Sequence, residues 1–91
     1  MKTIYKYPLI AMHTQTLELP KGSSILSVMN QFDEIVIYAL VDTEEKQTEK
    51  YTITTHGTGH KADDVCNFKF LGTVKLEDGR LMFHVFYRKD K

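Results

Sequence analysis

The sequence lacks most of the features that assign a chain quickly to a class of protein. It has one cysteine, Cys66, which excludes an internal disulfide and fits a reducing compartment. It has no tryptophan, two prolines and no long uninterrupted apolar run like that of a signal peptide or a membrane span. Its 12 Lys and Arg balance its 12 Asp and Glu, so no global positive field attracts nucleic acid or anionic membrane. We therefore expect a cytoplasmic protein that binds neither a nucleic-acid polymer nor a membrane.

The composition is that of a small folded protein. Residues 1–91 suffice for a single domain, and 42% hydrophobic with 26% charged residues is ordinary for a globular chain. At this length folding buries only about 60 to 70% of the surface that the unfolded chain exposes, so the core is modest. Self-association would stabilise such a chain by burying more of its surface, and we expect a homodimer or homotetramer with a site at the subunit interface.

Alternation of polar and apolar residues at a period of two predicts a β protein. Residues 34–41, EIVIYALV, form a continuous β-branched apolar run and are expected to be a central strand. Asp78 and Gly79 are a strong hairpin signal between strands at 68–77 and 81–88. Further strands are predicted at residues 2–7 (ending at Pro8), 15–19, 24–30 and 51–56. The expected fold is all-β, a small antiparallel sandwich or partly open barrel of six to seven strands, with at most one short helical turn near residues 63–66.

Three local features extend this prediction. The charged residues 42–50 are expected to be a solvated hairpin loop. The final strand is apolar on both faces, which predicts that both sides are covered, with a subunit interface as one candidate cover. Residues 68–77 are expected to place one set of side chains on a single face, namely Phe68, Phe70, Gly72, Val74 and Leu76, against Lys69, Thr73 and Lys75.

A glycine-rich segment follows the strand at 51–56 and is the first candidate for a binding loop. Gly57 and Gly59 would let backbone amides approach a ligand closely, while Thr58 and His60 offer side-chain donors. The alternative is that the two glycines only supply positive φ in a turn. The segment matches neither a P-loop nor a dinucleotide-binding fingerprint.

The first strand is the second candidate. Tyr5 and Tyr7 share one face while Lys6 lies on the other, which gives planar groups for stacking and a nearby cation, as nucleotide binding requires. The alternative is that these are half-buried edge tyrosines beside a solvated lysine.

Metal binding and catalysis are weaker alternatives. A zinc site would draw on His56, His60, Asp63, Asp64 and Cys66, but two glycines interrupt the histidine spacing. Catalysis would need a pair such as Cys66 with His60, or the adjacent aspartates, and neither sits in a motif of known mechanics. We expect no cofactor, no metal and no enzymatic activity.

Five motifs, in this order and at these spacings, carry a resemblance that spans nearly the whole chain. They are KTIYKYPL (residues 2–9), YALVD (38–42), GTGH (57–60), FLGTVKLEDG (70–79) and FHVF (83–86). The chain resembles a family of small phage-encoded proteins, which is similar to viral sponge proteins of the anti-CBASS type that sequester cyclic-nucleotide immune signals. The family often has tryptophan where this chain has Tyr5 and Tyr38, and proline where it has Lys61; tyrosine still stacks on a base.

The resemblance implies a phage anti-defence protein that acts in the host cytoplasm. It would bind a cyclic-dinucleotide signal without hydrolysing it, and a site shared between subunits would enclose such a ligand. The ligand-binding residues are then expected to be Tyr5, Lys6, Tyr7, Gly57, Thr58, Gly59 and His60. The alternatives are a protein-docking inhibitor of a host defence enzyme, and a metal-dependent hydrolase using His56, His60 and an aspartate.

Overall fold

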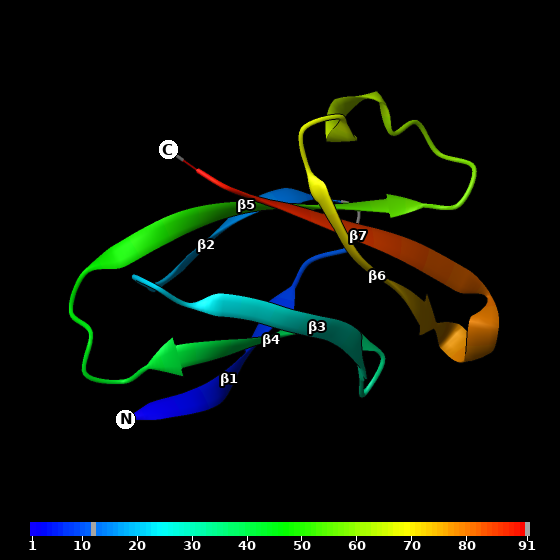
Figure 1. The fold of residues 1–91 in the computed structure, drawn as a ribbon. Coiled ribbons are helices and arrows are strands. Elements are labelled where there is room, and N and C mark those ends of the chain that lie inside the picture. The colour runs from blue at the N-terminus through cyan, green and yellow to red at the C-terminus, as the bar shows by residue number, and fades with distance from the viewer. Residues whose placement is uncertain (12, 91) are drawn as a thin grey trace.

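The computed structural model describes residues 1–11 and 13–90 and forms two antiparallel sheets packed as a sandwich (Figure 1). Sheet A has the strand order β1-β4-β3, and sheet B has the order β2-β5-β7-β6. The strands are β1 (Lys2–Leu9), β2 (Thr14–Pro20), β3 (Ser24–Gln31), β4 (Glu34–Asp42), β5 (Thr48–Gly57), β6 (Lys69–Leu76) and β7 (Leu81–Lys89). The all-β prediction is confirmed, and β4 is the centre of its sheet.

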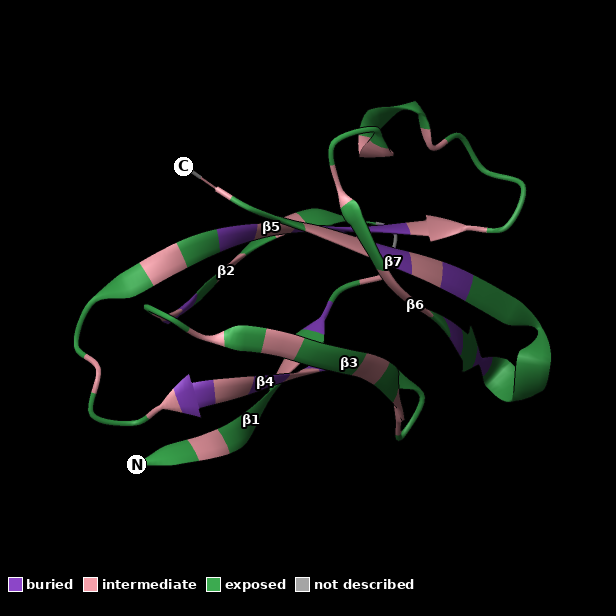
Figure 2. Cartoon of the chain, in the orientation of Figure 1, coloured by how far each residue is buried: buried purple, intermediate pink, exposed green. Residues whose placement is uncertain are grey.

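The core lies between the two sheets, where the purple segments of β4 in sheet A lie across from those of β5 and β7 in sheet B (Figure 2). Alternate residues of β4 point into it, so Ile35, Ile37, Ala39 and Val41 are all buried. Sheet B contributes its own alternate residues, which include Leu19, Ile53, Val74 and Val85. The period-two pattern of the sequence is therefore what forms the core.

The two sheets meet along a seam between β3 and β6. The Asn30 side-chain amide donates a hydrogen bond to the Lys75 carbonyl oxygen at 2.7 Å, and Asp33 Oδ1 accepts one from the Glu77 amide at 2.8 Å. Gly72 allows this approach, because a Cβ at that position would lie 2.9 Å from Val28 Cγ1. Strands β3 and β6 thus close one side of the sandwich without forming a ladder.

Two local predictions were wrong. β1 continues through Pro8, which is tolerated because β1 is an edge strand and Pro8 pairs only with Val36 of β4. Residues 42–50 do not form a hairpin loop, because β4 belongs to sheet A while β5 belongs to sheet B. The charged stretch instead joins the two sheets at one end of the sandwich.

A bulge in β6 overturns a third prediction. The register shifts between Phe70 and Gly72, so two consecutive residues occupy one position opposite β7. Phe70 therefore lies on the outer face of sheet B, 58% exposed, although the simple alternation placed it with Gly72, Val74 and Leu76. The same shift turns Lys69 to the inner face, opposite Tyr87.

Among residues 1–11 and 13–90, the helical content is two 3-10 turns. One, Asp63–Val65, lies where a single helical turn was expected, and the other, Glu77–Gly79, forms the predicted turn between β6 and β7. Within the described ranges, no helix has the length and apolar character needed to cross a membrane.

Candidate ligand-binding cleft

The predicted glycine-rich segment forms a tight turn at the end of β5. The Thr58 amide donates to the Met82 carbonyl oxygen at 3.2 Å, and the His60 amide donates to the Gly57 carbonyl oxygen at 3.0 Å. Gly59 has a φ of 85°, a conformation that glycine adopts without strain. The turn therefore uses two of its backbone amides to fix its own shape.

The side chains beside this turn are also hydrogen-bonded to one another. His84 lies between two threonines, with Nε2 2.7 Å from Thr58 Oγ1 and Nδ1 3.0 Å from Thr73 Oγ1. His56 Nε2 lies 3.1 Å from Thr54 Oγ1 and 3.3 Å from an Asp64 carboxylate oxygen. These contacts fasten the segment between β5 and β6 onto the outer face of sheet B, which covers part of β7.

A pocket of about 370 Å³ adjoins the turn. Its polar lining comes from Thr58, His60 and Arg80, and its apolar lining from the start of β7. Gly57 also lines this pocket, whereas Gly59 lies outside the lining. Three of the four predicted loop residues therefore share one pocket with a cation.

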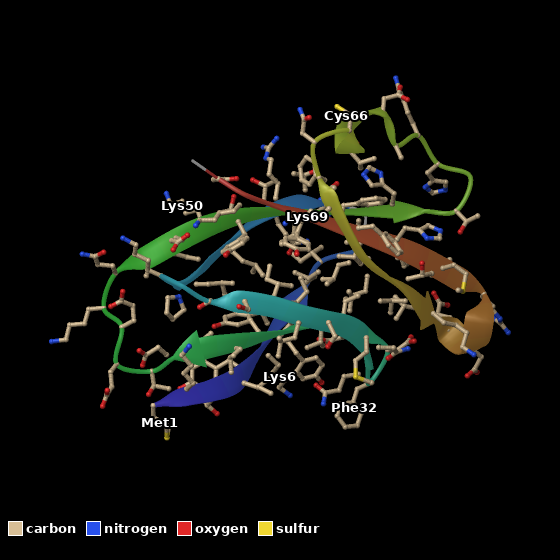
Figure 3. All side chains as sticks on the ribbon, viewed as in Figure 1. Met1, Lys6, Phe32, Lys50, Cys66 and Lys69 are labelled. Atoms are coloured by element: carbon tan, nitrogen blue, oxygen red, sulfur yellow. The ribbon has the colours of Figure 1, made fainter. Side chains whose placement is uncertain are left out.

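The predicted residues of β1 lie on the other sheet. Lys6 projects from the outer face of sheet A, and its Nζ donates to Gln31 Oε1 at 3.0 Å (Figure 3). Tyr5 and Tyr7 share the inner face, as predicted; Tyr5 is 49% exposed, while Tyr7 packs against the core. Burial of Tyr7 raises its pKa, and the nearby Tyr5 makes a smaller contribution in the same direction. The seven predicted residues thus form two groups on different sheets, and their role in binding stays a prediction.

The residues considered for metal binding are dispersed around the β5–β6 connection. His56 contacts Asp64, Asp63 pairs with Lys61 at 3.4 Å, and Cys66 is exposed. Within residues 1–11 and 13–90, no three His, Cys, Asp or Glu side chains gather closely enough to hold a metal ion.

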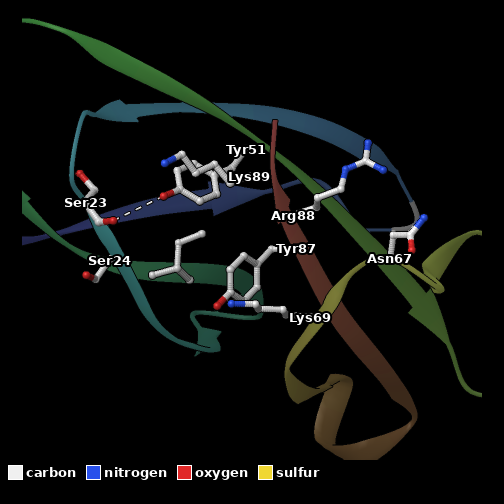
Figure 4. Close-up of a pocket in the computed structure, with 9 residues that line it drawn as sticks. Ser23, Ser24, Tyr51, Asn67, Lys69, Tyr87, Arg88 and Lys89 are labelled. Carbon is white, nitrogen blue, oxygen red and sulfur yellow. Dashed lines mark hydrogen bonds between the residues drawn. The ribbon is translucent and has the colours of Figure 1, made fainter. Parts of the chain in front are cut away.

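A second pocket, at the opposite end of sheet B, was not predicted (Figure 4). It lies between the sheets, where Ser24 and Ile25 at the start of β3 and Lys69 at the start of β6 line it. Strand register places four residues around it on the inner face, because Tyr51 is opposite Lys89 and Tyr87 is opposite Lys69. We call it the Tyr–Lys cleft. Its lining residues are Ser23, Ser24, Ile25, Tyr51, Asn67, Lys69, Tyr87, Arg88 and Lys89.

The two tyrosine rings shape the Tyr–Lys cleft. Their centroids lie 6.5 Å apart with a tilt of 46° between the ring planes. Tyr51 is buried and its hydroxyl donates to the Ser23 carbonyl oxygen at 3.4 Å, which makes it the floor of the cleft. Tyr87 is less buried, so its ring offers a planar surface. The cavity measures about 320 Å³, which is within the roughly 300–1,000 Å³ typical of small-molecule sites.

Cations flank these rings. Lys89 forms an ion pair with Glu49, and this hydrogen bond lowers the pKa of the Glu49 carboxyl and raises the pKa of Lys89. Lys69 has no carboxylate partner in the part of the chain that the structure describes. Arg88 also lines the cleft, but its side chain points away from the tyrosines and lies over the Phe68 ring, 4.6 Å from the centroid (Figure 4).

Sequence reasoning missed this cleft for an identifiable reason. Simple alternation placed Lys69 on the solvated face of β6, and only the bulge between Phe70 and Gly72 brings it opposite Tyr87. Part of the cleft could have been read from the sequence YRK at the end of the chain, where Tyr87 and Lys89 are two residues apart and so share one face of the final strand.

A family model matches residues 1–91 and carries the description "Domain of unknown function (DUF7352)". The chain belongs to this family. Neither the curated proteins nor the solved structures include a significant match to the chain. The match covers the full length of the chain and shows a family of uncharacterised domains, and its description gives no activity.

Proposed function

We propose that this protein is a binding module that holds a small nucleotide in the Tyr–Lys cleft without transforming it. The observation that carries the proposal is the register that sets Tyr51, Lys89, Tyr87 and Lys69 around one cavity between the sheets. Each half of a nucleotide then has a partner. A base stacks on an aromatic face, and a phosphate pairs with lysine ammonium groups.

The free lysine gives the cleft its preference for an anion. Because Lys69 has no carboxylate partner among the described residues, its charge is available to a phosphate without the loss of an existing ion pair. Lys89 becomes available when a phosphate competes with Glu49 for its ammonium group. The chain carries no net charge, so this local excess, rather than a long-range field, is the source of attraction.

The lining of the cleft favours binding over catalysis. The residues that line it include no histidine, aspartate or glutamate to act as a general base for the Ser23 or Ser24 hydroxyl, and the adjacent Glu49 is paired with Lys89. The volume is near the lower end of the range for ligand sites, which suits one nucleotide unit. A cyclic dinucleotide would therefore need cavities from two copies of the chain.

The finer proposal is that the ligand is a cyclic-nucleotide immune signal, sequestered in the cytoplasm of a phage-infected host. It is supported by the resemblance of the five motifs to the phage-encoded family and by the fact that a sponge requires only a binding site. Docking on a host defence enzyme remains the alternative function.

The test is a thermal-shift screen of the purified protein against cyclic di- and trinucleotides and mononucleotides, followed by heat release and chromatography of the ligand. A ligand at about 100 times its Kd adds about 2.7 kcal/mol to the free energy of unfolding, which raises the Tm by several degrees. We expect the ligand to be recovered intact. Recovery of a product would indicate an enzyme, and no shift with any nucleotide would contradict the proposal.

The nucleotide affinity of the variant Lys69→Gln tests whether the ligand lies in the Tyr–Lys cleft, and Lys75→Gln is the matched control. Both lysines are exposed on β6, but Lys75 pairs with Met82 and lies on the outer face of sheet B. Loss of a charge-assisted hydrogen bond should weaken nucleotide binding roughly tenfold in Lys69→Gln. Equal affinities of the two variants would place the ligand outside the Tyr–Lys cleft.

A further inference from the structure

The outer face of sheet A carries a row of apolar residues between charged and polar ones, and no described strand packs on it; Val36 in this row is only 2% exposed. β4 directs Val36, Tyr38 and Leu40 to this side, since these residues alternate with the buried core residues. β1 adds Ile4, which is 56% exposed, and β3 adds Met29, which is 52% exposed. We call this surface the A face.

The A face continues onto the turn between β3 and β4. Phe32 stands there 93% exposed, and it projects on the same side of the sheet as Lys6 (Figure 3). A strand that is apolar on both sides is typical of a strand covered on both sides. The exposed Ile4, Met29 and Phe32 thus surround the largely buried row of β4, and exposed apolar residues grouped in this way mark an interaction site.

We propose that the A face is the interface of a homodimer. In an isologous dimer each copy offers the same surface, so the surface must complement itself. The A face does so, because its middle column is the apolar row of β4. A two-fold axis parallel to β4 places this row of one copy on the same row of the second copy. The same axis places β1 of one copy over β3 of the other, so Lys6 lies over the serine-containing strand β3 and away from the second Lys6.

Charge also favours a second copy as the occupant. The A face carries Lys2 and Lys6 against Glu34 and Asp42, so its formal charges cancel. Lys6 already donates to Gln31, and Asp42 lies 3.4 Å from the N-terminal ammonium group of Met1. An anionic membrane would meet carboxylates as well as lysines here, whereas a second copy brings both signs in equal number. Glu34 and Asp42 meet their own equivalents only at the two ends of the β4 row, where Asp42 already pairs with the Met1 ammonium group.

The area is sufficient for a specific dimer. Three strands of eight or nine residues present a footprint of about 400 Å², and an aromatic side chain such as Phe32 adds roughly 200 Å². Each copy thus contributes about 600 Å², and the pair reaches the lower end of the range for specific interfaces, roughly 1,200 Å² in total. The outer face of sheet B also carries an exposed aromatic residue, Phe70, but threonines and the β5–β6 segment interrupt the surface around it.

The experiment is sedimentation equilibrium of the full chain from about 1 to about 100 µM. Ile4→Lys and Met29→Lys place a charge at the two edges of the A face, and in a monomer both lysines remain solvated, so the fold is kept. Phe70→Lys is the matched control, since Phe70 is 58% exposed on the outer face of sheet B. Far-UV circular dichroism checks that each variant is folded.

We expect the wild type to sediment at twice the chain mass of 10.6 kDa, and both A-face variants to dissociate with a Kd raised tenfold or more. Phe70→Lys should keep the wild-type Kd. A monomeric wild type over the whole range would overturn the proposal, as would a Phe70→Lys variant that dissociates as readily as Ile4→Lys. If one A-face variant unfolds, the other decides.

Discussion

The two ends of sheet B contain similar side chains but use them differently. At the glycine-turn end, the Thr58 hydroxyl contacts His84 and the His60 amide bonds to Gly57, so these groups serve the fold, while the side chains of His60 and Arg80 line the adjoining pocket. At the Tyr–Lys end, Tyr87 and Lys69 line an open cavity, and Lys69 has no carboxylate partner among the described residues. The comparison teaches that a polar, glycine-rich motif can serve the fold, while a ligand site needs groups that the fold leaves available.

Gly72→Ala should have the largest effect, which is a loss of folding stability. Gly57→Ala is the corresponding substitution at the glycine-turn end of sheet B. A Cβ on Gly72 would lie 2.9 Å from Val28 Cγ1 in the packed seam that bounds the cleft, which should lower the free energy of unfolding by about 1–3 kcal/mol. A Cβ on Gly57 would lie 3.1 Å from the ring of His60, which is exposed and can move. Urea denaturation measures both, and equal losses would show that the seam does not constrain the sandwich.

Glu49→Gln should strengthen nucleotide binding roughly two- to fivefold, because it frees Lys89 from its ion pair. Glutamine keeps an oxygen that can accept the hydrogen bond from the Gly22 amide, which Glu49 Oε1 accepts at 3.0 Å. Calorimetric titration gives the affinity, and Glu18→Gln on β2 is the control. Weaker binding in Glu49→Gln would mean that Lys89 plays no part in holding the anion.

The pH dependence of stability should reflect the Tyr–Lys end. The pKa of Glu49 is lowered chiefly by its hydrogen bond with Lys89, so this contribution is present above the ordinary value of 4.5 and is lost as the pH falls through the native pKa. The pKa values of Tyr51 and Lys89 are raised, by burial and by Glu49 respectively. Their contributions are present below the ordinary values of 10.0 and 10.5 and are lost as the pH rises through the native pKa values.

Denaturation midpoints across acid, neutral and alkaline pH test this dependence. Tyr51→Phe should flatten part of the alkaline loss, and Glu49→Gln should flatten part of the acid loss. Unchanged slopes in both variants would contradict the assignment of these groups.

His60→Ala should have the smallest effect, with nucleotide affinity changed less than twofold. His60 is exposed at the glycine turn, at the opposite end of sheet B from the Tyr–Lys cleft. Calorimetric titration beside Lys69→Gln makes the comparison direct. A large loss of affinity in His60→Ala would move the site back to the glycine turn.

Much of the fold could be predicted because period-two patterning records which face of a strand is buried. The run at β4 and the Asp78–Gly79 turn identified a central strand and a hairpin correctly. The bulge at Phe70 and Gly72 could not be read from the pattern, since one extra residue reverses the alternation and moves Lys69 to the inner face. The pairing of distant strands was equally inaccessible, so Tyr51 and Lys89 gave no joint signal until β5 and β7 were adjacent.

The most direct test is a nuclear magnetic resonance titration of the isotope-labelled protein with the nucleotide that gives the largest thermal shift. The account predicts that the amide signals of Lys69, Tyr87 and Lys89 move most and those of residues 57–60 move little. Shifts concentrated at residues 57–60, or no nucleotide that shifts any signal, would contradict it.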